Sequence, residues 1–191
     1  MRTDIMLFTS YHGTDTASCQ QILTYNFRAS AKIGWLGTGS YLFQDDFELA
    51  KYYPSTKNSL DGEQDIQVLK CEINIPAEKV YDVTDPSGAN NKVFHIVRQQ
   101  LIDKELSKSR KNAKSSEVNV QKINKNLDGI VFNAICRRED YHLVRAHTYT
   151  FQDIERKHPI FFTHIPNGTE LCLRDNTYIV NKTIVGGESI G

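Results

Sequence analysis

The chain has 191 residues, a length that suits one folded domain whose core is large enough to be stable without disulfide bonds. Basic and acidic side chains balance at 23 each, so no net charge draws the whole protein to nucleic acid or to a membrane. Any such attraction must be local. Hydrophobic residues make up 39% and charged residues 24%, which are ordinary values for a globular protein.

The cysteines and the N-terminal segment indicate the compartment. The four cysteines lie far apart and form no C-x-x-C pair, so we expect neither a metal site nor a disulfide framework, but buried free thiols. The apolar run near the N-terminus is too short for a signal peptide, and Asp4 interrupts the approach to it. No later run approaches a membrane span. The expected location is therefore the reducing cytoplasm, without membrane contact.

The first part of the chain predicts strands that alternate with short helices. Residues 5–11 are typical of a strand, which we expect to end in a turn at 12–14 before a helix over 17–25. A glycine-rich loop then leads to a short apolar strand over 41–43. A second helix is expected after it, capped by one of two consecutive aspartates and ended by Pro54.

The remainder is richer in strands than in helices. One further helix is expected over 93–106, where apolar residues recur at helical spacing. Strand-like segments lie at 65–75, 130–132, 141–149, 161–162, 170–173 and 178–185. Early helices and late strands indicate an α+β fold with antiparallel sheets packed together, in a single domain over residues 1–191.

A polar, lysine-rich insertion spans about 107–126. Its composition is typical of a solvated loop with a short helix. The other interpretation is a basic surface at the edge of the active site that binds an anionic acceptor such as RNA.

Two segments carry residues suited to binding a flat ring attached to a sugar. His12, Gly13 and Thr14 offer an imidazole, a closely approachable backbone and a hydroxyl, although a histidine at a strand end is often structural. Glycines precede Tyr41, and Tyr52 lies on the next helix, so the two rings either flank one flat ligand or belong to the core. The glycines form no dinucleotide-binding fingerprint, because no β-α-β unit surrounds them.

These segments resemble the PARP-like, or diphtheria-toxin-like, ADP-ribosyltransferases. That family carries histidine-glycine-serine/threonine, then a G-x-G-[IV]-Y-F block, and then an A-x-Y helix. The corresponding residues here are 12–14, the glycine block with its tyrosine at 34–43, and 50–52, in the same order. The resemblance is good over residues 5–53 and thin over 54–160.

The family's third motif is a glutamate that opens a late strand. Glu170 fits this description, and Glu188 is a weaker candidate near the end of the chain, although a glutamate at a strand start is often structural. Leu49 stands where the family often has a serine, and Thr38 and Glu48 stand where some members have lysines. These differences bear on the tightness of NAD+ binding and on chain elongation.

The resemblance implies the ADP-ribosyltransferase fold, with two packed, mainly antiparallel sheets and flanking helices, and NAD+ as substrate. It assigns NAD+ binding to His12, Gly13, Thr14, Arg28, Tyr41 and Tyr52. The nicotinamide ring would lie between the two tyrosines, its amide on the glycine backbone and the diphosphate on the arginine. Catalysis would use His12 and Tyr41 with Glu170, whose carboxylate offsets the charge that develops on the ribose.

The resemblance leaves the acceptor of ADP-ribose open between protein and nucleic acid, and the lysine-rich insertion favours RNA or DNA. Arg145 and His147 alternate along an expected strand and face either the cleft or solvent. A short catalytic chain is similar to stand-alone bacterial or phage transferases that act as toxins or defence effectors. Such an enzyme implies a neutralising antitoxin protein as a partner.

Three other interpretations stay open. A relative of the tRNA 2′-phosphotransferases would transfer ADP-ribose to an RNA phosphate and would use basic residues in place of the glutamate. A module that keeps the fold without catalysis would only bind NAD+ or ADP-ribose. A sheet-rich interaction protein would carry the motifs by accident, which their joint order and spacing argue against.

Overall fold

The computed structural model describes residues 3–28, 32–57, 65–111, 126–151, 155, 158 and 163–186. Helices in this part of the chain are α1 (Thr16–Tyr25), α2 (Phe47–Lys57), α3 (Ala89–Lys111) and α5 (Leu127–Glu139), with short 3₁₀ helices at Ala77–Lys79 and Asn176–Tyr178. Strands are β1 (Ile5–Asp15), β2 (Ser40–Gln44), β3 (Ile66–Pro76), β4 (Val80–Asp82), β5 (Leu143–Thr148), β6 (Gly168–Leu173) and β7 (Ile179–Val185). Most of the 107–126 insertion, residues 161–162 and Glu188 lie outside the described residues. No helix among those described combines the length and apolarity needed to cross a membrane.

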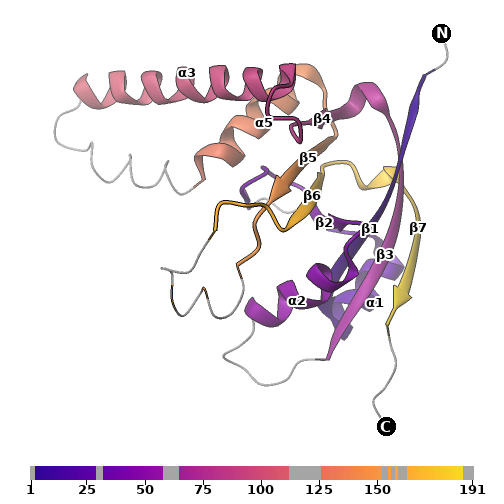
Figure 1. Ribbon diagram of the computed structural model, residues 1–191. Coiled ribbons are helices and arrows are strands. Elements are labelled where there is room, and N and C mark those ends of the chain that lie inside the picture. The colour runs from indigo at the N-terminus through magenta and orange to yellow at the C-terminus, as the bar shows by residue number, and fades with distance from the viewer. Residues whose placement is uncertain are drawn as a thin grey trace.

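All seven strands belong to one sheet, in the order β4-β5-β6-β2-β1-β3-β7 (Figure 1). The β4–β5 pair is parallel and the other pairs are antiparallel. The predicted α+β class is therefore confirmed. The prediction of two packed sheets is wrong, because β2 pairs with β6 on one edge and with β1 on the other and so joins the two halves.

The two halves of the sheet nevertheless separate where β1 meets β2. These strands share two consecutive residue pairs, the last of which joins Tyr11 to Phe43. Beyond that point β1 continues beside β3 through Asp15, whereas β2 continues beside β6. The expected turn at 12–14 is therefore wrong, because β3 pairs with β1 along its whole length. One edge of residues 12–14 faces an opening instead of a neighbouring strand.

The core is built on both faces of the sheet, as alternate residues of β6 show. Leu171 and Leu173 belong to the cluster that contains Cys19 of α1. Cys172, between them, belongs to the cluster that contains Ile135 of α5. Helix α1 therefore covers one face of the sheet, and α3 and α5 cover the other face at the β4-β5-β6 end (Figure 1).

Helix α1 begins and ends at defined contacts, which confirm the predicted helix and its cap. The Asp15 carboxylate accepts the Ser18 amide at 2.9 Å, as an N-cap does. At the other end Asn26 adopts φ 68°, and its backbone N–H donates to the Ile22 carbonyl at 2.9 Å.

Helix α2 is capped as predicted, since the Asp46 carboxylate accepts the Leu49 amide at 2.8 Å, but it does not end at Pro54. A proline has no amide to bond the carbonyl four residues earlier, which here is that of Ala50. That carbonyl packs against Gly13 so closely that an added Cβ would lie 1.8 Å from its oxygen. The absence of a side chain at Gly13 therefore lets the backbone and the proline ring of α2 approach β1 closely.

The predicted strand at 130–132 is wrong, because this segment lies inside α5. Its buried apolar side chains recur at helical spacing across the whole helix: Leu127, Val131, Phe132, Ile135 and Cys136. A three-residue apolar run cannot by itself distinguish a strand from a buried helix. The predicted strands at 65–75 and 178–185 are confirmed, and the register of the β3–β7 pairing shifts between Glu72 and Ile73.

Candidate functional site

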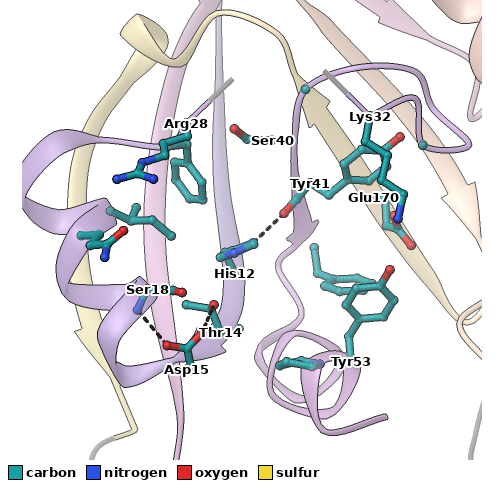
Figure 2. Close-up of a pocket in the computed structure, with 18 of the residues that line it drawn as sticks. His12, Thr14, Asp15, Ser18, Arg28, Lys32, Ser40, Tyr41, Tyr53 and Glu170 are labelled. Atoms are coloured by element: carbon teal, nitrogen blue, oxygen red, sulfur yellow. Dashed lines mark hydrogen bonds between the residues drawn. The ribbon is translucent and has the colours of Figure 1, made fainter. Parts of the chain in front are cut away.

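A cavity of about 790 Å³ lies at the opening between β1 and β2 (Figure 2). Helix α1 contributes to one side, and the glycine-rich segment and α2 contribute to the other. Residues that the resemblance pointed to meet in its lining: His12, Gly13, Thr14, Arg28, Tyr41 and Glu170. The cavity therefore joins segments that are far apart in the sequence.

Gly13 directs its peptide groups toward this opening. The Thr9 carbonyl accepts the Asp45 amide at 3.0 Å, which places the backbone groups of Thr9 on the β2 edge of β1. Peptide groups of a strand alternate between its two edges, so those of Tyr11 and Gly13 point to the same edge as those of Thr9. Because β2 has already diverged at Gly13, the N–H and C=O of this residue face the cavity.

His12 links the two strands after their backbones separate. Its ring Nδ1 lies 2.8 Å from the Tyr41 carbonyl oxygen. A carbonyl can only accept, so Nδ1 carries the hydrogen, and Nε2 of a neutral ring holds the lone pair. Phe27 meets the imidazole edge to face, with ring centroids 5.0 Å apart. These two contacts fix both the tautomer and the orientation of the ring.

Tyr41 is held in place at its hydroxyl. The hydroxyl donates to the Gly37 carbonyl at 2.8 Å and accepts the Leu36 amide at 2.9 Å. Burial raises the pKa of the Tyr41 phenol far above its ordinary value, with the nearby Cys172 thiol acting in the same direction. A neutral phenol with both hydrogen-bonding roles in use offers its ring as a fixed wall, not its proton as a catalytic acid.

The glycine-rich segment is a rigid turn that supports this wall. The Gly34 and Gly37 amides each donate to the other's carbonyl, at 3.0 and 3.1 Å. Gly37 has φ 97°, a conformation that favours glycine. The Asn133 amide oxygen, on α5, accepts both the backbone amide and the hydroxyl of Thr38 at 2.9 Å. The two hydrogen bonds between the glycines close the turn, and the two hydrogen bonds to Asn133 hold it against α5.

Glu170 is a carboxylate with a side chain enclosed by the fold, since the residue is only 7% exposed. Its Oε1 accepts the Thr148 hydroxyl at 3.2 Å and its Oε2 accepts the Trp35 indole N–H at 3.3 Å. Strand β6 pairs Glu170 with Phe43 on one side and Ala146 on the other, so the carboxylate stands in the middle of the sheet. Sequence reasoning missed Thr148 and Trp35, since only the strand register and the folded turn bring them to the glutamate.

Four charged side chains lie at different places around the cavity (Figure 2). Arg28 follows α1, on the opposite side of the cavity from Tyr41 and Glu170. Lys32 lies above the glutamate, and its side chain extends toward Glu170. Asp15 lies below His12, and the hydrogen bonds that it accepts from Ser18 lower the pKa of its carboxyl. The lining thus combines two carboxylates with two basic side chains.

The tyrosine of α2 that lines the cavity is Tyr53, whereas the sequence pointed to Tyr52. Successive residues of an α-helix point in directions about 100° apart, so both tyrosines cannot face the same space. The Tyr53 ring meets Phe43 edge to face with centroids 5.7 Å apart, and its hydroxyl points toward the end of the cavity that holds Glu170 (Figure 2).

Arg145 and His147 lie apart from the cavity lining. The Arg145 guanidinium donates to the Gln44 amide oxygen and to the Asp82 carboxylate, both at 2.7 Å. His147 is exposed, and its Nδ1 lies 2.9 Å from the Thr169 hydroxyl. The sequence left open whether these two side chains face the cleft or solvent, and neither of them faces the cleft.

Within the described ranges, no three histidine, cysteine, aspartate or glutamate side chains are grouped as a metal ion would require. All four cysteines are buried and free. Comparisons of the chain with protein-family models, with curated proteins and with solved structures give no match.

Proposed function

We propose that the chain is an ADP-ribosyltransferase, which cleaves the nicotinamide–ribose bond of NAD+ and transfers ADP-ribose to a macromolecule. The observation that supports this most directly is one cavity shared by the 12–14 segment, Tyr41 and the enclosed Glu170. An aromatic wall, an exposed strand edge and a carboxylate are the groups that a cationic pyridinium amide on a sugar requires.

In the binding step, the nicotinamide ring lies between Tyr41 and Tyr53. Its amide bonds the N–H and C=O of Gly13, which point into the cavity from the edge of β1. A ring without that amide would leave buried backbone groups unpaired and would be rejected. The Nε2 of His12 accepts a ribose hydroxyl, and Arg28 pairs with the diphosphate.

In the chemical step, the bond between C1′ of the ribose and the nicotinamide nitrogen breaks, and its electron pair leaves with neutral nicotinamide. The ribose then carries oxocarbenium-like positive charge. The Glu170 carboxylate lies in the cavity lining and stabilises this charge more than it stabilises the ground state. An acceptor nucleophile bonds to C1′ and releases its proton to water. Water itself is the acceptor when no macromolecule is bound.

The position of Glu170 separates this proposal from one alternative, and an assay separates it from another. A tRNA 2′-phosphotransferase relative would have basic residues in place of a glutamate. Here the Glu170 carboxylate lies in the cavity on the same side as Tyr41. A binding module without catalysis would hold NAD+ and release no nicotinamide. Incubating the protein with NAD+ and measuring free nicotinamide decides between enzyme and binding module.

The acceptor class can be found with label on the adenosine part of NAD+. The protein is incubated with this substrate and a cell lysate, and the labelled product is treated with nuclease or with protease. Transfer to a macromolecule predicts label that one of the two treatments releases. Label that remains entirely in free ADP-ribose contradicts the transferase proposal and leaves an NAD+ hydrolase.

The two tyrosines of α2 provide a matched test of the ring-binding site. Tyr53→Ala is expected to weaken NAD+ binding about 2- to 12-fold, the range that corresponds to the loss of one aromatic stack. Tyr52→Ala, one residue away on the same helix, should leave the affinity unchanged. Calorimetric titration of both variants with NAD+ measures the difference. Equal affinities would show that the ring does not lie against Tyr53.

An unregulated transferase inside a cell is harmful, so the proposed function includes toxicity and a neutralising protein partner. Induced expression of the wild-type chain is expected to arrest growth, and expression of Glu170→Gln is expected to leave growth normal. Growth curves with matched protein levels measure this effect. Normal growth with both chains would contradict the toxin role, though not the transfer reaction.

A further inference from the structure

Trp35 is the single tryptophan of the chain, and 43% of it is exposed. It stands at the tip of the turn closed by Gly34 and Gly37. Its neighbour in the turn, Leu36, is fully buried in the cluster beneath α3 and α5. The turn therefore anchors one apolar side chain in the core and presents the other, a large flat ring, at the edge of the cavity.

The fold fixes the position of this ring. Tyr41 bonds the backbone of the turn at Leu36 and Gly37, and Asn133 bonds it at Thr38. The Trp35 indole N–H donates to the Glu170 carboxylate at 3.3 Å. One edge of the indole thus lies beside the carboxylate that we place at the reacting bond, while part of its surface remains open to solvent.

We propose that Trp35 is the platform for the acceptor, and that the acceptor is a base of single-stranded nucleic acid stacked on the exposed indole. This inference rests on the proposed ADP-ribosyltransferase function. Stacking on an aromatic ring is the usual way in which proteins hold unpaired bases. It would bring a nucleophilic group of that nucleotide to the side of the cavity where Glu170 lies.

The charges around the ring favour this acceptor over a basic peptide. Lys32 lines the same cavity as Trp35, on the side that holds Glu170, and suits a phosphate next to a stacked base. An arginine or lysine side chain of a protein acceptor would meet repulsion from Lys32. Transfer then forms a bond from C1′ of the ribose to an oxygen or nitrogen of the nucleotide, which loses its proton to water as nicotinamide leaves.

The lone tryptophan gives a direct measurement. Titration of the whole chain with single-stranded RNA and DNA oligonucleotides is expected to quench Trp35 emission, and a duplex of the same sequence should quench it much less. Trp35→Ala should weaken binding of a labelled single strand at least about fivefold, the lower end for one base stack. Trp35→Phe keeps a stacking ring and should bind within about threefold of wild type. Tyr25→Ala removes a more exposed ring (79%), outside the cavity lining, and should bind as wild type.

Nicotinamide release into water, measured without any acceptor, keeps this inference separate from the function on which it rests. If nicotinamide is released but single strands neither quench Trp35 nor lose affinity in Trp35→Ala, the acceptor platform is wrong and the enzyme proposal stands. Quenching by an arginine-rich peptide together with transfer to that peptide also overturns the platform for bases. If no nicotinamide is released under any condition, the proposed function itself fails.

Discussion

Replacing Glu170 with glutamine is expected to lower the rate of nicotinamide release at least about 10²-fold, the scale on which one preorganised electrostatic group acts. Glutamine keeps the shape of the side chain but removes the negative charge that offsets the developing charge on the ribose. The affinity for NAD+ should change little, because the tyrosine rings, the Gly13 backbone and Arg28 all remain. The loss should therefore appear in kcat with KM nearly constant.

Thr148→Val is the matched control for this variant. It removes the hydroxyl that donates to Oε1 of Glu170, and it keeps both the Trp35 indole donor and the negative charge. Its loss of rate should be much smaller than that of Glu170→Gln. Rates measured at saturating NAD+, with calorimetric affinities for each variant, make the comparison. Unchanged turnover in Glu170→Gln would retire its assignment, and a loss explained by weaker NAD+ binding would make it a binding residue only.

Gly13→Ala is expected to destabilise the protein and to abolish NAD+ binding. The added Cβ would lie 1.8 Å from the Ala50 carbonyl oxygen and 3.0 Å from the Pro54 ring. These atoms belong to the backbone and to a rigid ring, so α2 must move away from β1. Overpacking of this kind costs about 1–3 kcal/mol, which for a protein of this size lowers Tm by about 2–12 °C. Displacement of α2 also moves Tyr53, which lines the cavity and which we propose contacts the nicotinamide ring.

Gly168→Ala gives the matched control for Gly13→Ala. Its Cβ would also meet a close atom, at 2.5 Å, but that atom is the terminal methyl of Leu49, which can rotate away. Its Tm should fall much less than that of Gly13→Ala. Thermal unfolding of both variants, followed by circular dichroism, measures the difference. Equal melting temperatures would show that α2 is not fixed against Gly13 as described.

Features set by neighbours in the sequence were predicted well. Asp15 and Asp46 cap their helices where the pattern of polar and apolar residues indicates, because a cap bonds an amide three residues away. The strand at 65–75 follows from its apolar alternation, which depends only on the two-residue period of a strand. Errors arose where a distant contact changed a local preference. Helix α2 continues past Pro54, at a point where it packs closely against Gly13 of β1.

The site was predicted in part for the same reason. His12 and Tyr41 were predicted from short motifs, and in the structure the His12 ring bonds the Tyr41 carbonyl. Tyr53 was missed by one residue, because the phase of a helix depends on which face packs against the sheet. The partners of Glu170 could not be predicted, since Thr148 and Trp35 reach it from a separate strand and a separate turn.

The sequence by itself determined the α+β class, the helix caps and the residue types of the candidate site, because these depend on composition and on contacts within a few residues. Only the tertiary structure decided that the strands form one sheet and that this sheet opens between β1 and β2. That opening arises from strand pairings between distant segments, which no local pattern encodes. It converts the Gly13 backbone, the Tyr41 ring and the Glu170 carboxylate into one cavity.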